Sequence, residues 1–316
     1  MKDTPQIYLA PMQGFTDFVY RNALHRHFNS IDKYFTPYLV LENDGSVRNS
    51  KLKEIFPENN DQVVIPQILP ANEEELVRLT DLIAGYGYHE ININMACPYP
   101  MVTRRGRGAG LLPSPEKIEM LLKTAFSKFD LQFSVKLRAG LESFQEIEAI
   151  IPILNQYPLT EIILHPRIAS QLYKGAADKA LFRSVRDKIS LPLIYNGDIF
   201  TLNDFEICSQ ELEGQSGWMI GRGILSDPFL PQKIKYGQEY DNATKLKVLK
   251  AFHDDLFGNY SLSAANDRQL IIKMTQHWEY LSHSFIDPHK TYKKIKKATR
   301  LDRYQNVITE IFNQQE

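Results

Sequence analysis

Three side chains of this sequence have the types and settings to perform chemistry: Cys97, Lys136 and His165. Cys97 lies in NINMACPYP, and a thiol with an ordinary pKa of about 8.5 can donate a proton or, once ionised, act as a nucleophile. Lys136 lies inside the apolar run SVKLR, where burying an ammonium is costly unless it ends in a polar site. It could form a Schiff base or stabilise a bound anion such as a reduced flavin ring. His165, a lone histidine in IILHP, suits a structural or a functional role equally.

Disulfide and metal chemistry are not expected. The chain has two cysteines, Cys97 and Cys208, which cannot make a disulfide framework and favour a reducing cytoplasm. It has no CxxC motif and no Cys/His set with zinc spacing, so we expect no structural metal. Cys208, in FEICSQEL, fits a small buried hydrophobic residue.

Eight short runs rich in β-branched and aromatic residues precede residue 225, and helix-like segments separate most of them. They begin at Ile7, Lys33, Val63, Glu90, Gln132, Glu161, Leu191 and Gly217. This alternation predicts a (β/α)8 TIM barrel, which typically takes roughly 250 residues. The alternative, a doubly wound open sheet, is disfavoured because no GxGxxG follows the first strand.

In such a barrel the active-site groups come from the C-terminal ends of the strands. The polar or flexible residues found there are Met12, Gln13, Gln67, Asn94, Cys97, Lys136, Arg138, His165, Arg167, Asn196, Asp198 and Gly221–Gly223. The residues after the seventh and eighth strands indicate phosphate binding, because Gly197, Gly221 and Gly223 allow close backbone approach and Arg222 adds charge. Ordinary turn chemistry would explain the glycines equally well.

After about residue 238 the pattern changes to helices alone, over 243–258, 264–285 and 289–313. We therefore expect a barrel domain over 1–237 and a small helical domain over 238–316. His289–Arg303 holds five lysines and two arginines against one aspartate. Lys293, Lys297 and Arg300 follow helical spacing i, i+4, i+7, which predicts one basic face.

The whole chain is close to neutral, with a net charge of −1, and 43% of its 316 residues are hydrophobic. This excludes a disordered chain and a generally basic nucleic-acid binder, but it leaves room for a local basic surface. No run approaches the ~20 apolar residues of a membrane span. The N-terminus lacks the features of a signal peptide, so we expect a cytoplasmic protein and, by default, a monomer.

Eight motifs together resemble the tRNA-dihydrouridine synthases, flavin enzymes that reduce specific uridines of tRNA. In chain order they are APMQGFTD (10–17), PQIL (66–69), NINMACP (92–98), GRGAGLL (106–112), SVKLRAG (134–140), LHPRIASQLYKGAAD (164–178), IYNGDI (194–199) and MIGRGIL (219–225). The resemblance implies an FMN-binding catalytic barrel, NADPH as reductant, and a helical domain that binds tRNA.

The resemblance also implies residue roles. Cys97 matches the family's proton donor, and Asn94 and Arg138 match residues that hold the target base. The flavin contacts would be Pro11, Met12, Gln67, Lys136 and His165, with the FMN phosphate at Asn196, Gly197, Asp198, Gly221 and Arg222. The tRNA backbone would meet Arg104, Arg105, Arg107, Lys293, Lys297 and Arg300. Ala96 and Pro166 depart from the family pattern, where glycines are usual.

Other functions fit parts of the pattern. A flavin barrel acting on a free pyrimidine, like dihydroorotate or dihydropyrimidine dehydrogenases, would use the same pocket with the cysteine as a base. A lyase or aldolase would use Lys136 as a Schiff-base nucleophile. An RNA-binding module that has lost its chemistry would need neither the cysteine nor the lysine. The basic helical segment favours a tRNA substrate over a free pyrimidine, because a small-molecule enzyme has no need of it.

Overall fold

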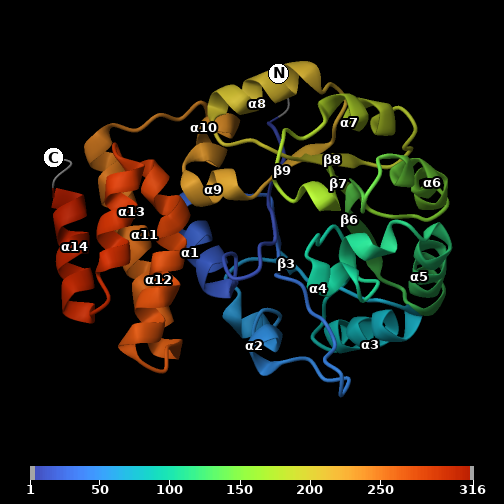
Figure 1. Cartoon of the computed structure of the whole chain (residues 1–316), viewed down its shortest axis with the longest axis horizontal. Helices are drawn as coiled ribbons and strands as arrows, with labels where there is room; N and C mark the ends of the chain where they lie inside the picture. Colours follow the sequence, from blue (N-terminus) through green and yellow to red (C-terminus); the bar gives the residue numbers. More distant parts are fainter. Residues whose placement is uncertain (1–3, 314–316) are drawn as a thin grey trace.

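Parallel β-strands form the centre of the molecule in the computed structural model, which describes residues 4–313 (Figure 1). They are β1 (Ile7–Leu9), β2 (Lys33–Phe35), β3 (Val64–Ile65), β4 (Gln67–Ile68), β5 (Glu90–Met95), β6 (Gln132–Gly140), β7 (Ile162–Ile168), β8 (Leu193–Asn196) and β9 (Gly217–Ile220). They pair side by side in the order β3-β2-β1-β9-β8-β7-β6-β5-β4. All eight strands predicted from the sequence are present, and the third is split into β3 and β4.

Pro66 causes that split and lies where the sheet closes. Proline has no N–H to donate, so it interrupts the ladder between β3 and β4. β3 pairs with β2 on one side, and β4 pairs with β5 on the other. The carbonyl of Pro66 accepts a hydrogen bond from the Asn92 N–H at 2.9 Å, which continues the pairing across the break. The sheet is therefore a closed barrel, and the open-sheet alternative is wrong.

Helices follow the strands and surround the barrel (Figure 1). They are α1 (Phe18–Phe28), α2 (Asn49–Leu52), α3 (Glu73–Ala84), α4 (Pro100–Thr103), α5 (Pro115–Lys128), α6 (Gln145–Leu154), α7 (Lys179–Arg186), α8 (Leu202–Glu211), α9 (Arg222–Ser226) and α10 (Leu230–Tyr236). Asn72 caps α3 by accepting a hydrogen bond from the Glu75 N–H. Pro115 lies in the first turn of α5.

Two of the hydrophobic clusters among the described residues hold this arrangement together. The smaller lies on inward-facing strand positions and includes Tyr8, Phe35, Ile163 and Met219. The larger lies between the outward-facing strand positions and the helices. Because successive side chains of a strand point to opposite faces, one strand supplies both clusters. Inward positions nearer the C-terminal ends of the strands carry the polar residues of the site.

The C-terminal region consists of α11 (Asn242–Ser263), α12 (Asp267–Leu281), α13 (Pro288–Lys297) and α14 (Leu301–Asn313). The expectation of one helical stretch over 289–313 is wrong, because α13 ends at Lys297 and buried Ala298 takes a non-helical conformation. That break lets α14 turn back and pack Tyr304 and Ile308 into the core. Lys293, Lys297 and Arg300 therefore do not share one helical face.

The helical region packs against the barrel through α1. Phe252 of α11 lies against Tyr20 and Phe28 of α1, with ring centroids 5.7 and 5.3 Å apart, and His277 of α12 stacks on Tyr20 at 5.3 Å. The larger hydrophobic cluster runs through both parts of the chain. A division of the chain at 237–238 stays a prediction. No helix within residues 4–313 is long and apolar enough to cross a membrane.

Arg21 of α1 is fully buried, and its guanidinium donates to Glu54, Asn60 and the Thr16 carbonyl, each at 2.8 Å. Arg21→Met would leave the buried Glu54 carboxylate unpaired, so we expect the free energy of unfolding to fall by about 3–5 kcal/mol in urea denaturation. Adding Glu54→Leu should recover part of the loss. The exposed pair Arg48–Glu42 is the control, since Arg48→Met should cost less than about 1 kcal/mol. An Arg21→Met protein as stable as the wild type would contradict this.

Candidate active site

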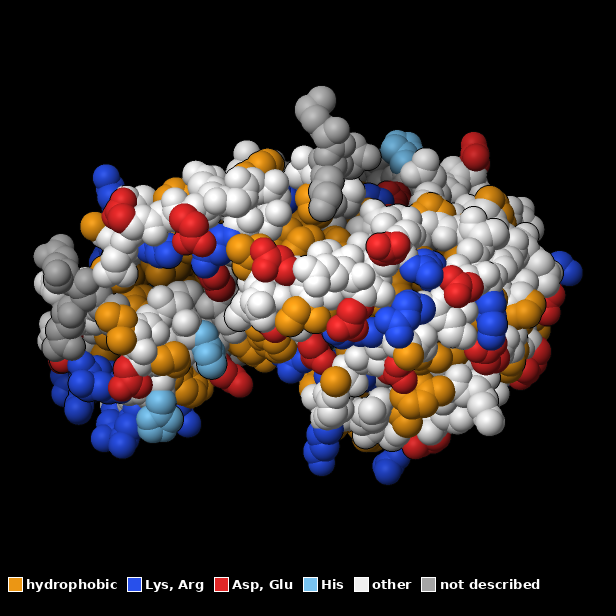
Figure 2. Space-filling model, turned by 90° about the horizontal axis from the view of Figure 1, so that it is seen from above, with side chains coloured by type: hydrophobic (Ala, Val, Ile, Leu, Met, Phe, Trp, Pro, Cys, Tyr) orange, Lys and Arg blue, Asp and Glu red, His pale blue; other side chains and the backbone are white. Residues whose placement is uncertain are grey.

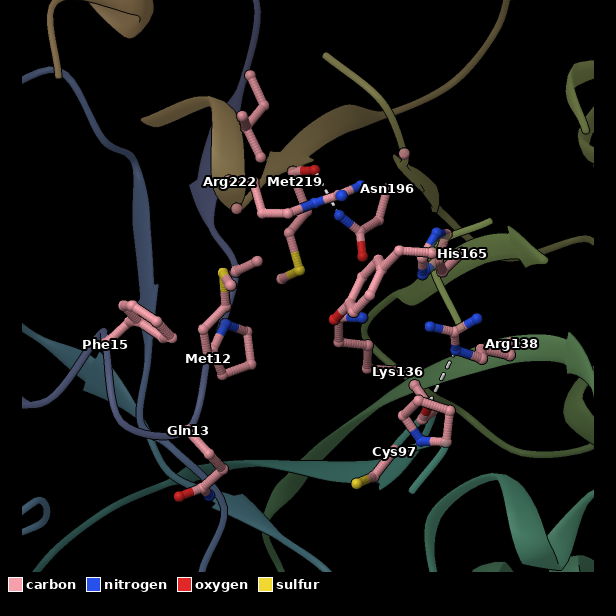
Figure 3. A pocket seen from close by; sticks show the side chains of 18 of the residues that line it. Met12, Gln13, Phe15, Cys97, Lys136, Arg138, His165, Asn196, Met219 and Arg222 are labelled. Atoms are coloured by element: carbon pink, nitrogen blue, oxygen red, sulfur yellow. Dashed lines mark hydrogen bonds between the residues drawn. The ribbon is translucent and has the colours of Figure 1, made fainter. Parts of the chain in front are cut away.

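The C-terminal ends of the strands surround a cavity of about 540 Å³. Met12, Gln13 and Phe15 follow β1 on one side of it, and Lys136, Arg138 and His165 of β6 and β7 lie across from them (Figure 3). Lys136 and Arg138 are two residues apart on one strand, so both point inward. The cavity is also lined by four other residues of the ring predicted from the sequence, Asn94, Cys97, Asn196 and Arg222.

The Cys97 segment is held in a fixed conformation by Asn94. The Asn94 side-chain oxygen accepts hydrogen bonds from the backbone N–H groups of Ala96 and Cys97, both at 2.9 Å. Gly108 packs on the other side with φ +58°, and a Cβ at this position would come within 2.8 Å of the Cys97 carbonyl oxygen. Gly108, the second glycine of GRGAGLL, is therefore required for close approach to Cys97 as well as for its backbone angle.

Burial raises the pKa of the Cys97 thiol above its ordinary value. A contact with the Tyr38 hydroxyl and the charges of Arg138 and Lys136 lower it, but burial is the largest cause. The thiol is therefore protonated at neutral pH. This suits a proton donor better than a nucleophile, which requires the thiolate.

Lys136 brings a positive charge to the cavity without a negative partner. Within residues 4–313 it forms no ion pair with any carboxylate. Burial, together with the nearby charge of Arg138, lowers the pKa of Lys136 to about 7. Near neutral pH the group is therefore only partly protonated, and a bound anion or an electronegative ring edge would favour its ammonium form.

His165 is neutral, and its hydrogen bond identifies the tautomer. Its Nε2 lies 3.0 Å from an Arg167 nitrogen, and because a guanidinium only donates, Nε2 accepts and the proton is on Nδ1. Burial and the charges of Arg138 and Lys136 lower the pKa of His165 well below its ordinary value. His165 therefore stays an uncharged donor in the cavity.

Asp198 organises the end of the cavity expected to hold phosphate. It accepts hydrogen bonds from Arg167 at 2.5 Å, the Ala177 N–H at 2.8 Å and Arg222 at 3.2 Å. Its carboxylate thus positions cations and would repel a phosphate itself. The Arg222 guanidinium, at the first residue of α9, lies 4.4 Å from the centre of the Tyr173 ring. Arg167 is the residue of this group whose role we did not predict.

Glycines shape the same end. A Cβ on Gly221 would lie 3.1 Å from the Met12 sulfur, and one on Gly197 would lie 2.7 Å from the Ala177 Cβ. Asn196 donates to the Met219 carbonyl at 2.7 Å, which joins β8 to β9 beneath these loops. The glycines therefore serve close packing around the cavity, beyond simple turn formation.

Arg138 is held by the backbone around it. It donates to the carbonyls of Ala96 and Ile168, both at 3.1 Å, and its guanidinium lies 5.6 Å from the centre of the Tyr173 ring. Burial lowers the pKa of Arg138 to about 10, which leaves it charged at neutral pH. It fixes the Cys97 segment to the end of β7.

Two predicted site residues lie elsewhere. Gln67 does not line the cavity: its side chain is buried behind Asn94, from which it accepts a hydrogen bond at 2.7 Å, and it donates to Asn92 at 2.8 Å. Arg107 is bound to the Glu75 carboxylate at 2.6 Å and anchors its loop to α3. Its charge is already paired within the protein.

The remaining predicted basic residues are exposed. Arg104 and Arg105 directly follow α4, whose Met101 lines the cavity, and Lys293 and Lys297 lie on α13. Arg300 follows α13 and pairs with Asp302 at 3.0 Å. Basic side chains gather at the outer end of the helical region, and the surface is hollowed between this end and the barrel (Figure 2).

The helical region also contributes to the cavity. Tyr280 of α12 lines it and packs edge-to-face on Phe15, with ring centroids 5.1 Å apart. Lys273 donates to the Gly14 carbonyl at 2.7 Å and pairs with Asp17 at 2.8 Å, which ties the segment after β1 to α12. No sequence signal linked Tyr280 to the cavity, whereas Gln13 and Tyr173 lie inside motifs that we had singled out.

Comparisons with known proteins cover nearly the whole chain. A family model described as dihydrouridine synthase matches residues 8–315. The tRNA-dihydrouridine(16) synthase of Neisseria meningitidis serogroup B is 24% identical over 322 residues, which cover 98% of this chain and 95% of that protein. tRNA-dihydrouridine synthase B of Shewanella oneidensis is 24% identical over 239 residues, covering 75% of this chain and 73% of its own length.

Solved structures share the fold at low sequence identity. The old yellow enzyme from Trypanosoma cruzi superimposes with a TM-score of 0.54 at 10% identity and covers 75% of this chain and 89% of its own. Morphinone reductase gives a TM-score of 0.52 at 10% identity, covering 75% and 87%. Both support the barrel architecture.

Proposed function

The chain belongs to the dihydrouridine synthase family, and from that membership we propose that it reduces a uridine of tRNA to 5,6-dihydrouridine with FMN as cofactor and NADPH as reductant. One observation carries the proposal: the same cavity is lined by a protonated Cys97 thiol and by Lys136, which has no carboxylate partner among the described residues. Reduction of the uracil 5,6 double bond needs a hydride at one carbon and a proton at the other. The cavity offers a proton donor and a cation for an anionic cofactor.

The described residues fit a flavin mononucleotide. Lys136 has no carboxylate partner among residues 4–313, and glycines 197, 221 and 223 line the cavity beside Arg222 with backbone that no side chain covers. When bound, FMN would supply the hydride. We propose that Pro11, Met12, Lys136 and His165 contact its ring, and that Asn196, Gly197, Gly221 and Arg222 surround its phosphate. Gln67 and Asp198 would act indirectly, by positioning Asn94 and Arg222.

The chain's own part in the reaction is to hold and deliver one proton. Asn94 and Arg138 fix the backbone around Cys97, so the thiol keeps its place at the edge of the cavity. Burial keeps the thiol protonated until the uracil is bound. We propose that Cys97 protonates C5 of the uracil, and that Asn94 and Arg138 also contact the base. A target base stacked in folded RNA must first leave its stack to reach this depth.

Two basic surfaces are available to the tRNA backbone. Arg104 and Arg105 follow α4, whose Met101 lines the cavity, and Lys293 and Lys297 lie on α13 in the helical region (Figure 1). We propose that both bind phosphates, with the helical domain 238–316 orienting the tRNA. Arg107 and Arg300 contribute less, because each is paired with a carboxylate. The enzyme would act as a cytoplasmic monomer.

We further propose that the uridine is the one at position 16. The relatives named tRNA-dihydrouridine(16) synthase from two Neisseria meningitidis strains match 97–98% of this chain, so the likeness includes the helical region. How that region holds the tRNA decides which uridine reaches the cavity.

The test uses the purified full chain and unmodified tRNA. We expect flavin absorbance, its bleaching by NADPH, and its return when tRNA is added, with dihydrouridine appearing at position 16 by mass spectrometry. A protein that binds no FMN would overturn the proposed function. Reduction of free uracil in place of tRNA would favour the free-pyrimidine alternative, and dihydrouridine at another position would overturn the assignment of position 16 alone.

A further inference from the structure

Two large apolar side chains stand exposed at the edge of the cavity. Tyr99 is 51% exposed and Met101 is 79% exposed, yet both line the cavity that contains Cys97. Val102 belongs to the short helix α4, which begins directly after Tyr99 and contains Met101, and it is buried against Leu69 and Cys97. Folding thus requires Val102 and leaves Tyr99 and Met101 facing outward. Apolar groups exposed together beside a binding site mark a contact surface.

Positive charge lies next to these side chains. Arg104 and Arg105 follow α4 directly, both are exposed, and neither pairs with a carboxylate in the described part of the chain. Arg107, a few residues further on, is instead bound to Glu75. The segment therefore anchors itself with one arginine and leaves two available. An aromatic ring beside unpaired guanidinium groups matches the chemistry of single-stranded RNA, which has flat bases and charged phosphates.

The segment is also rigid enough to act as a platform. The Tyr99 carbonyl accepts from the N–H groups of Val102 at 2.8 Å and Thr103 at 3.0 Å. Gly110 packs so closely below that a Cβ there would lie 2.3 Å from the Thr103 carbonyl oxygen. The backbone of this segment therefore does not have to be ordered when a ligand binds.

We propose that Tyr99 and Met101 form a stacking surface for a nucleotide that flanks the target uridine, while Arg104 and Arg105 hold the phosphates of the same strand. The inference rests on the proposed function, because it assumes that the target base enters this cavity. A uridine drawn out of its stack into the cavity leaves its neighbour without a stacking partner. The Tyr99 ring can replace that partner at the cavity edge. These residues would then influence which sequence beside a uridine is accepted.

The experiment measures KM and kcat for unmodified tRNA with the FMN-loaded full chain at equal flavin content. Stacking of a base on an aromatic ring is worth about 1–3 kcal/mol, so Tyr99→Ala should raise KM by roughly 5- to 150-fold. Tyr99→Phe keeps the ring and should stay close to the wild type. Leu262→Ala is the matched control, because Leu262 is 87% exposed but does not line the cavity. Met101→Ala should raise KM by a smaller factor.

A second measurement locates the contact. A tRNA with an abasic nucleotide beside the target uridine, made for each side in turn, should be a poorer substrate for the wild type. Tyr99→Ala has already lost the stacking contact, so on one of the two sides the abasic nucleotide should lower its activity little further. A KM for Tyr99→Ala equal to that of the wild type, or equal losses from Tyr99→Phe and Tyr99→Ala, would overturn the inference. So would a change in oligomeric state on Tyr99→Ala, which would assign the surface to a second copy of the chain. A wild type that reduces no tRNA would instead overturn the proposed function itself.

Discussion

Replacing Cys97 with alanine is expected to lower the rate of dihydrouridine formation by about 10²- to 10⁴-fold, the usual contribution of a positioned general acid. Burial keeps this thiol protonated, and Asn94 and Gly108 fix the backbone that carries it. Alanine occupies less space and leaves those backbone contacts in place. FMN binding and the bleaching of the flavin by NADPH should therefore remain near the wild-type level. The loss should appear in the rate constant for reoxidation of the reduced flavin by tRNA, measured in a single turnover.

Cys208 supplies the matched control. It is the second free cysteine, buried on α8 away from the residues that line the cavity. Cys208→Ala should retain turnover even if it lowers stability. Cys97→Ser is a more stringent variant, because a hydroxyl has similar size but is a far weaker acid than a thiol. Full turnover by Cys97→Ala or Cys97→Ser would remove Cys97 from the role of proton donor.

Replacing Lys136 with methionine is expected to weaken FMN binding by about 10- to 100-fold, since a hydrogen bond from a charged group contributes about 1.5–3 kcal/mol. Methionine keeps most of the length of the side chain and removes the charge. No carboxylate within residues 4–313 pairs with Lys136, so its loss leaves no acidic side chain unpaired and folding should be little affected. The reduced flavin should suffer more than the oxidised flavin, and its midpoint potential should become more negative. Fluorescence titration and a redox titration measure the two effects.

The pH dependence of FMN binding tests the same residue. The pKa of Lys136 is lowered to about 7, so in the ligand-free protein the ammonium loses its proton as pH rises above that value. Binding then requires proton uptake, and affinity should fall by up to about tenfold per unit above about pH 7. Lys136→Met should show a flat profile there, and Lys136→Arg should bind FMN without this loss. Equal pH profiles in the wild type and Lys136→Met would assign the dependence to another group.

Much of the fold followed from the sequence because it depends on local patterns. Short β-branched runs separated by amphipathic segments define strands and helices, and eight such repeats before residue 225 leave few topologies other than a barrel. Alternation along a strand then places Lys136 and Arg138 on the same side, and the carboxyl ends of parallel strands meet at one end of the barrel. Cys97, Lys136 and His165 could therefore be assigned to one cavity before any distance was known.

The break between α13 and α14 escaped this reasoning. Residues 289–313 have continuous helical periodicity, so nothing local ends the helix at Lys297. The chain turns at Ala298 because α14 must bury Tyr304 and Ile308 against the rest of the core. The tertiary gain outweighs the helical preference of the segment, and the predicted basic face is lost with the turn.

The sequence by itself determined the barrel, the position of each polar side chain along its strand, and the ring of groups at one end. Only the tertiary structure decided which of those groups are free. Arg107 is neutralised by Glu75, Asp198 is used by three donors, Gln67 supports Asn94 from behind, and Tyr280 enters the cavity from α12. Each depends on partners that lie 21 to 265 residues away in the chain. Strand periodicity reports where a side chain points, whereas its charge state and availability depend on what the whole fold packs against it.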